Sequence, residues 1–177
     1  MPCTSNYEIS DAEIAKAQSI LRKIHDKTKL GIDNGKGPFY AELYDEHYNF
    51  VVGASNSVIE TQCALNHAEM NTLKLAFERF KNYNLAQYKL TLFVNAEPCI
   101  MCLGAIMWSG VNRIIFSVPS SEVEKITGFD EGFKPDWFDE MKKRNIKVCG
   151  GIDEEYGKKI LQYYVEIGKT VYKPTHE

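Results

Sequence analysis

The sequence contains no stretch that approaches the ~20 consecutive apolar residues of a membrane-spanning helix, so we expect no membrane segment. Residues 1–11 lack the basic region and the following apolar region that are typical of a signal peptide. A basic excess is also missing, because 21 Lys and Arg stand against 24 Asp and Glu and give a net charge of −3. Since domains that bind nucleic acid usually carry a strong basic excess, we expect no nucleic-acid partner.

The five cysteines are an odd number in a chain of 177 residues, which is long enough to form a sizeable core without cross-links. This argues against a disulfide framework and for a reducing compartment, so we expect a cytoplasmic protein. With 44% apolar and 25% charged residues, the composition is that of an ordinary globular protein. No repeat or break in composition marks a boundary, and we expect residues 1–177 to form one domain.

Apolar periodicity predicts strands and helices that alternate along the chain. Ser10 and Glu13 form a capping box before a helical stripe that reaches Thr28. The expected strands cover residues 39–44, 50–54, 90–95, 113–118 and 146–149, and further helices begin near residues 67, 99, 135 and 153. Such alternation, with a hairpin made by the first two strands, predicts an α/β fold, a three-layer α/β/α sandwich around a five-stranded mixed sheet. The helix over 99–109 is apolar on nearly all sides and is expected to be buried, whereas His25 lies in a polar context and is expected to face solvent.

Two short motifs contain the residues that zinc prefers as ligands, His67-Ala-Glu69 and Pro98-Cys99-Ile-Met-Cys102. The two cysteines are three residues apart and share one face of a helix, whose start Pro98 favours. Both thiolates would then lie at the positive end of the helix, which stabilises their charge. His67, Cys99 and Cys102 with an open fourth position predict a catalytic site that holds one zinc ion per chain.

Two other interpretations of these motifs remain open. A Cys-x-x-Cys pair alone is often a redox pair, but a redox role explains neither Pro98 nor the His-x-Glu motif. A closed structural zinc site would need a fourth ligand, and Cys63 lies four residues before His67. Cys63 precedes Asn66, the expected N-cap of the helix that carries Glu69 in its first turn. A closed site also has no use for Glu69, so an open site is favoured.

The two motifs together resemble the zinc nucleobase deaminase signature H-x-E and P-C-x-x-C, and the chain is identified as a member of the cytidine deaminase-like superfamily. Within this superfamily it is most similar to small bacterial guanine deaminases, well over residues 37–132 and poorly over the last forty or so. The segments that carry the resemblance are Gly37-Pro-Phe39, Asn56-Ser-Val58, His67-Ala-Glu69, Glu97 to Ile106, Trp108 and Gly128-Phe-Asp-Glu131. The resemblance implies hydrolytic deamination of a purine base, guanine to xanthine and ammonia.

The resemblance also implies a mechanism. Zinc on His67, Cys99 and Cys102 would lower the pKa of a bound water towards ~7 and so supply hydroxide at neutral pH. Glu69 would not be a ligand; it would take the proton of the water and deliver it to a ring nitrogen, while the hydroxide attacks the carbon that bears the amine. One carboxylate can serve as base and then as acid, so that ammonia leaves after a second proton transfer.

Further residues are implied to act on the substrate, and each has an ordinary alternative role. Phe39 would stack on the base, or be a core residue at a strand start. Asn56 would hydrogen-bond the purine, or be a turn residue. Glu131 would contact the substrate as a second catalytic proton carrier and Asp130 would share its role, or both would belong to a solvated acidic loop. Trp108 matches a Trp beside the pocket in the family, or is a core residue.

The chain also departs from the guanine deaminase pattern. Tyr40 stands where a Gly is usual, and a bulky residue there could reshape the pocket. The segment from Gly168 onward differs too much to assign a residue, although C-terminal segments of guanine deaminases can cover a neighbouring subunit's pocket. We expect a homodimer that takes a small-molecule purine as its substrate.

Three other functions stay open on the sequence: a deaminase of purine nucleosides, a tRNA adenosine deaminase, and a zinc-stabilised binding module closed by Cys63. The tRNA deaminases place a His where this chain has Trp108, and Lys-Thr-Gly where it has Lys125-Ile-Thr127. An RNA substrate would also need a positive surface for its phosphates, which a net charge of −3 does not supply overall.

Overall fold

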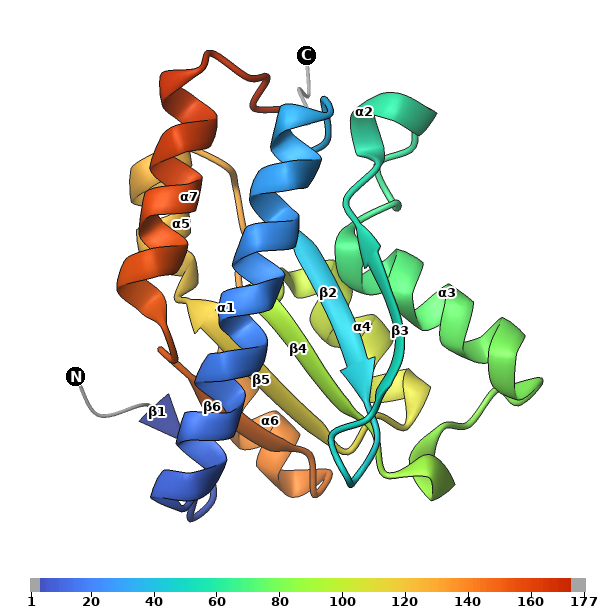
Figure 1. Cartoon of the computed structure of the whole chain (residues 1–177). Coiled ribbons are helices and arrows are strands. Elements are labelled where there is room, and N and C mark those ends of the chain that lie inside the picture. The colour runs from blue at the N-terminus through green and yellow to red at the C-terminus, as the bar shows by residue number, and fades with distance from the viewer. Residues whose placement is uncertain (1–3, 173–177) are drawn as a thin grey trace.

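A computed structural model describes residues 4–172 and contains one six-stranded sheet with helices on both faces (Figure 1). The strands are β1 (Thr4–Ser5), β2 (Tyr40–Tyr44), β3 (Phe50–Ser55), β4 (Thr91–Ala96), β5 (Arg113–Val118) and β6 (Lys147–Gly150). The helices are α1 (Asp11–Asp33), α2 (Val58–Thr61), α3 (Ala68–Phe80), the 3-10 turn η1 (Ala86–Tyr88), α4 (Ile100–Ser109), α5 (Ser120–Thr127), α6 (Trp137–Lys143) and α7 (Glu154–Glu166). The strand order is β1-β6-β5-β4-β2-β3, in which β4, β5 and β6 are parallel and the other pairings are antiparallel.

Alternating residues of the central strands are buried on opposite faces of the sheet. On β4, Leu92 and Val94 pack with α3 and α4, whereas Phe93 packs with α1. On β5, Ile114 joins the first group and Ile115 the second. With α1 and α7 on one face and α3 and α4 on the other, both faces are covered, which is why these strands are apolar at nearly every position (Figure 1). The expected three-layer sandwich is confirmed.

The sheet has six strands rather than the expected five. The additional strand, β1, consists of two residues whose partners on β6 are Gly150 and Cys149. Two residues are too few to show the alternation on which a strand prediction depends. The helix α5 was also not expected; it has eight residues and ends at Gly128, which adopts a left-handed conformation with φ of 76°. These two short elements are stabilised by their neighbours, because β1 pairs with β6 and Val123 of α5 packs in one cluster with Leu161 of α7.

Two expectations about burial are wrong. The helix α4 is not buried on all sides, because Trp108 is 89% exposed and Ile100 is 49% exposed. His25 is fully buried rather than solvent-facing, and its Nε2 lies 3.0 Å from Ser117 Oγ. Burial lowers the pKa of His25 to about 4, so the ring is neutral near pH 7. Within residues 4–172, no helix is long and apolar enough to cross a membrane.

The parallel strands bring several candidate residues to one edge of the sheet. Strand β4 ends at Ala96, and Cys99 follows three residues later at the start of α4. The Glu97 N–H donates to the carbonyl of Val118, the last residue of β5 (2.8 Å). Proteins with such sheets bind ligands outside the carboxyl ends of the strands, and the candidate site lies at the carboxyl ends of β4 and β5.

Candidate functional site

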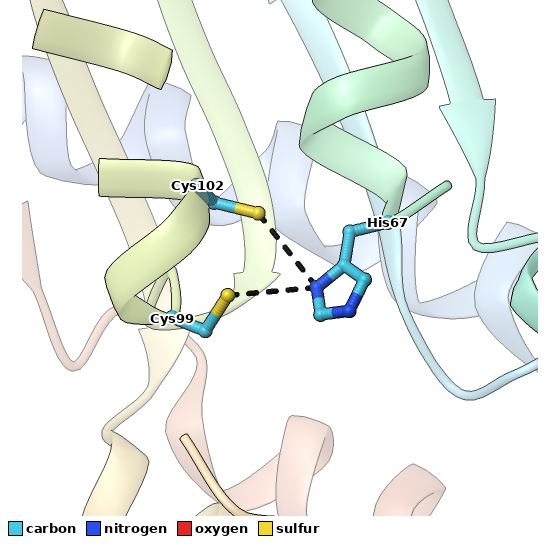
Figure 2. Close-up of side chains that lie close together, drawn as sticks. All are labelled: His67, Cys99 and Cys102. Atoms are coloured by element: carbon cyan, nitrogen blue, oxygen red, sulfur yellow. Dashed lines mark hydrogen bonds between the residues drawn. The ribbon is translucent and has the colours of Figure 1, made fainter. Parts of the chain in front are cut away.

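The three expected zinc ligands lie at the starts of two helices (Figure 2). His67 and Cys99 are the N-cap residues of α3 and α4, both with an extended backbone, and Cys102 lies in the first turn of α4. The His67 Nδ1 atom is 3.5 Å from Cys99 Sγ and 3.7 Å from Cys102 Sγ. The three ligand atoms all lie within 4.8 Å of one another, and both sulfur atoms turn towards the imidazole ring.

These separations fit a zinc ion. With Zn–S bonds of ~2.3 Å and Zn–N bonds of ~2.05 Å, tetrahedral angles place sulfur and nitrogen about 3.6 Å apart. The observed distances from Nδ1 to the two sulfur atoms, 3.5 and 3.7 Å, bracket this value. Within the part of the chain that the structure describes, no fourth His, Cys, Asp or Glu joins the group. Three protein ligands are typical of a catalytic zinc site, in which the fourth position is left for water or substrate.

Cys63 lies in the turn between α2 and α3 and lines the neighbouring cavity, but it is not part of the ligand group. Its backbone N–H donates to the carbonyl of Val58 (3.2 Å), and its own carbonyl accepts from the Asn66 N–H (3.1 Å). These bonds make Cys63 a turn residue. The arrangement favours the open site over a site closed by a fourth thiolate.

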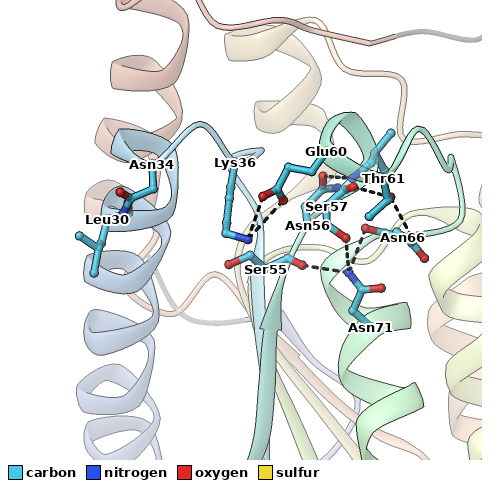
Figure 3. A network of polar contacts seen from close by, with 11 residues as sticks. Leu30, Asn34, Lys36, Ser55, Asn56, Ser57, Glu60, Thr61, Asn66 and Asn71 are labelled. Atoms are coloured by element: carbon cyan, nitrogen blue, oxygen red, sulfur yellow. Dashed lines mark hydrogen bonds and ion pairs between the residues drawn. The ribbon is translucent and has the colours of Figure 1, made fainter.

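Asn66 is not the N-cap of α3, contrary to the expectation, because the helix begins one residue later and His67 takes that position. The Asn66 side chain instead donates to Thr61 Oγ1 (2.8 Å). Asn71, in the first turn and a half of α3, donates from one amide group to the carbonyls of Ser55 (3.0 Å) and Asn66 (3.2 Å), as Figure 3 shows. These bonds tie the incoming turn to the helix and so fix the backbone that carries His67.

The two thiols share a strongly polarised environment. Hydrogen bonds with Cys102 and with His67 lower the pKa of the Cys99 thiol to about 4, although burial opposes them. The hydrogen bond with Cys99, together with burial, raises the pKa of Cys102. Burial acts to lower the pKa of His67, but the hydrogen bond with Cys99 and the charge of Cys99 outweigh burial, so the pKa of His67 is raised above its usual value. The metal-free site therefore contains a thiolate at Cys99, and a cation that binds both sulfur atoms would displace the proton of Cys102.

Glu69 is the second residue of α3 and lines the cavity, with 5% of its surface exposed. Burial raises its pKa to about 7, and the charge of Cys99 adds to the rise while His67 opposes it. A carboxyl group with a pKa near 7 can take up and release a proton at neutral pH. The geometry thus gives Glu69 the properties of an acid–base group next to the ligand cluster.

The ligand cluster borders a cavity of about 560 Å³, a usual size for a small-molecule site. Glu131 lines this cavity from the loop between α5 and α6 and is 6% exposed. Burial, and then the charge of Cys99, raise the pKa of Glu131 to about 8. A bound divalent cation would offset the contribution of Cys99 and favour the carboxylate form. The cavity therefore contains two buried carboxyl groups, from segments far apart in the sequence.

Phe39 lines the cavity and contacts the edge of Phe129, with ring centroids 5.3 Å apart. Its position is fixed by Asn95 near the end of β4, a residue that the sequence did not reveal. The Asn95 side chain donates to the carbonyl of Pro38 (2.9 Å) and accepts from the N–H of Tyr40 (2.8 Å). Tyr40 itself packs on the α1 side of the sheet and does not line the cavity, so it does not reshape the pocket as the sequence suggested.

Asn56 is buried beside the cavity but does not line it. Its Nδ2 donates to the Tyr172 hydroxyl oxygen (2.7 Å), and its Oδ1 accepts from the Val58 N–H (3.2 Å). Tyr172 does line the cavity, and its ring centroid is 5.0 Å from that of Phe129 and 6.3 Å from that of His67. The segment after α7 thus reaches the cavity of its own chain through Tyr172, and residues 173–177 lie outside the described part. No motif pointed to Tyr172.

Two other expected residues have different positions. Asp130 lines the cavity at its exposed rim, where its Oδ1 accepts from the Gly132 N–H (2.9 Å) and stabilises the turn. Trp108 is exposed and is not among the described residues that line the cavity. Both expectations for Trp108, a position beside the pocket and a position in the core, are therefore wrong.

The arrangement can be compared with known proteins. The family model described as the cytidine and deoxycytidylate deaminase zinc-binding region matches residues 14–118, which include His67, Glu69, Cys99 and Cys102. The chain belongs to this family. Membership of the family and the His-Cys-Cys group together identify this protein as a hydrolytic deaminase with Zn²⁺ as its cofactor. The resemblance that the two motifs indicated is confirmed.

Members of the deaminase family that are similar to this chain differ in substrate. A probable cytosine deaminase of Schizosaccharomyces pombe is 32% identical over 123 residues, 70% of either chain. A tRNA-specific adenosine deaminase of Buchnera aphidicola subsp. Schizaphis graminum is 31% identical over 133 residues, 75% of this chain and 82% of that one. The solved guanine deaminase of Nitrosomonas europaea has a TM-score of 0.80 at 26% identity, and the match covers 91% of this chain and 87% of the other. The reaction class is common to all three; the substrate is not.

Proposed function

We propose that this deaminase acts on a free purine base and converts guanine and water to xanthine and ammonia. The observation that carries the proposal is the second buried carboxyl group, Glu131, in the same cavity as Glu69 and the His-Cys-Cys group. One carboxyl group suffices for the proton transfers of hydrolytic deamination. A second one is available to recognise the ring that is to be deaminated.

The recognition argument rests on which edge of the base faces Glu131. Guanine presents its N1–H and its exocyclic amine as donors on one edge, and an ionised carboxylate is an acceptor-only group. The corresponding edge of adenine presents N1 as an acceptor, which a carboxylate repels. A buried mismatch of this kind costs ~1–3 kcal/mol, about tenfold to a hundredfold in selectivity. Asp130, at the rim, adds a second negative charge on the same side.

The chain's own residues divide the work as follows. His67, Cys99 and Cys102 hold Zn²⁺, which when bound lowers the pKa of a coordinated water and so supplies the attacking nucleophile. Glu69 takes a proton from the water and passes it to the base, because burial raises its pKa towards the range in which a carboxyl group both accepts and releases a proton. Glu131 holds the donor edge of the ring and supplies a second proton route towards the departing ammonia.

Aromatic and amide groups orient the ring. Phe39, fixed through Asn95, offers an apolar face on which a purine stacks. Asn56 supplies the amide beside the cavity that would hydrogen-bond the purine, and its partner Tyr172 lines the cavity as an aromatic cover. A base on a macromolecule would have to leave this cover open, which favours a small substrate over a tRNA anticodon loop.

A panel of substrates tests the proposal. The zinc-loaded protein is assayed for ammonia release with guanine, guanosine, adenine, adenosine, cytosine and cytidine, and for inosine formation in an anticodon stem-loop at the same enzyme concentration. We expect guanine to be the preferred substrate, with xanthine as the product. Inosine in the stem-loop without xanthine from guanine would contradict the proposal, as would turnover of cytosine alone. The homodimer and the cytoplasmic location stay predictions, which sedimentation and cell fractionation can check.

A further inference from the structure

Lys134 is a charged residue in the loop between α5 and α6, and its side chain is only 7% exposed. Its ammonium group donates to Glu97 Oε1 (2.7 Å), to the carbonyl of Pro98 (3.2 Å) and to Ser120 Oγ. An ammonium group has three donors, so all of them are used. The partner Glu97 is itself 12% exposed, and its other oxygen accepts from the Ser120 N–H (3.1 Å). The pair is therefore shielded and fully hydrogen-bonded.

This pair joins the two segments that carry the chemistry of the cavity. Glu97 lies two residues before the ligand Cys99, and Lys134 lies three residues after Glu131. A second link runs between the same segments, because the Ile100 N–H donates to the Glu131 carbonyl (3.2 Å). The loop that carries Glu131 has no regular secondary structure, so these links, with the Glu131 N–H bond to Glu124 Oε1 (3.2 Å), hold it in place.

We propose that Lys134 is a positioning residue, which fixes the loop of Glu131 onto the segment of Glu97 and thereby sets the distance of the Glu131 carboxyl group from the reacting base. Lys134 is not among the described residues that line the cavity, so its effect on the substrate would pass through Glu131. The proposal rests on the proposed function in so far as Glu131 contacts the substrate. The anchoring of the loop can be measured without any substrate.

Hydrogen–deuterium exchange of the zinc-loaded protein tests the anchoring. In Lys134→Met we expect faster exchange at two amides. The Ile100 amide bonds to the Glu131 carbonyl and joins the two segments, and the Glu131 amide bonds to Glu124 and holds the loop. The zinc content should not change. The matched control is Arg113→Met. Arg113 is the first residue of β5, at the end of the strand opposite to the cavity; it forms an ion pair with Glu13 and is similarly shielded (14% exposed). The control should leave exchange in these two segments unaltered. Unaltered exchange in Lys134→Met would overturn the proposal.

A double-mutant cycle separates positioning from mere stabilisation. We expect Lys134→Met to lower kcat/KM about tenfold, within the range of coupling between residues of one network, and to do so less than twofold when Glu131→Gln is already present. An equal loss in both backgrounds would mean that Lys134 acts on the whole fold, and would overturn the proposal. Lys134→Arg keeps the charge and should recover part of the activity that Lys134→Met loses.

A milder variant covers the case in which Lys134→Met does not fold. Ser120→Ala removes one of the three acceptors and should give smaller changes in the same direction, in exchange and in kcat/KM. No change in either measurement would count against the proposal. If the unmodified protein converts no purine, the proposed function fails, while the exchange experiment still decides whether Lys134 anchors the loop.

Discussion

Glu131→Gln should change how the stability of the zinc-free protein depends on pH. In the fold the pKa of Glu131 is raised by burial, and then by the charge of Cys99, from 4.5 to about 8. The folded state therefore binds more protons than the unfolded state between these two values, and stability falls as the pH rises. The contribution is fully present below pH 4.5 and is lost as the pH passes about 8. The substitution removes this titration, so stability should vary less with pH.

The size of the effect follows from the shift. One pKa unit corresponds to 1.36 kcal/mol, so the rise corresponds to about 4 to 5 kcal/mol over the whole range. Between pH 5.5 and 7.5 the loss should be about 2 to 3 kcal/mol. Glu69, whose pKa is raised to about 7 chiefly by burial, contributes in the same direction and keeps part of the slope in Glu131→Gln. The free energy of unfolding of Glu131→Gln should thus depend less on pH than that of the unmodified protein, but it should still fall as the pH rises.

Urea unfolding of the chelated protein at pH 5.5, 6.5 and 7.5 measures these slopes. Glu140→Gln is the control, because Glu140 is paired with Lys143 and Arg144 on α6 and its pKa is lowered. Because Glu140 is ionised at pH 5.5 and above, Glu140→Gln should leave the pH dependence of the free energy of unfolding unchanged between pH 5.5 and 7.5. A Glu131→Gln variant that is as pH-dependent as the unmodified protein would show that the folded state does not hold a protonated Glu131, and would refute the reasoning.

Three further predictions concern the site. Glu69→Gln should retain zinc and fold but lose at least ~10²-fold in kcat, since Gln cannot carry the proton, and a near-normal rate would transfer the role to Glu131. Cys63→Ser should keep about one zinc ion per chain, measured by atomic emission, whereas Cys102→Ser should lose zinc. Loss of zinc in Cys63→Ser would favour a closed site. Tyr172→Phe should leave the Asn56 amide without its partner and lower the free energy of unfolding by ~1–3 kcal/mol, and an unchanged value in urea titrations would refute this contribution.

The ligand cluster could be predicted from the sequence because its spacing is local. Cys99 and Cys102 are brought together by one helical turn, and Glu69 follows His67 by two residues. The type and order of the long elements were also predictable, since β4 and β5 carry runs of apolar residues that only a doubly covered strand needs. In both cases the signal lies within a few neighbouring positions.

The remaining features depend on contacts between distant segments. Tyr172 reaches Asn56 across 116 positions, and His25 is buried because α1 places it against Ser117. The polar neighbours of His25 in the sequence lie on the other face of α1 and gave the wrong expectation. Asn95 supports Phe39 from another strand, and Lys134 finds its acceptors only when the loop folds onto the cysteine segment. Side-chain periodicity contains no information about such pairs.

The position of Tyr172 also has a practical consequence for how the protein is produced and labelled. Because Tyr172 lines the cavity, an affinity tag or a fluorescent protein joined directly after this residue would be attached beside the cavity. The strand β1, by contrast, lies at an edge of the sheet, where it pairs with β6 (Figure 1), and neither of its residues lines the cavity. Fusions made before β1 are therefore the suitable format for activity screens, and a label joined directly after Tyr172 would serve as a reporter for access to the cavity.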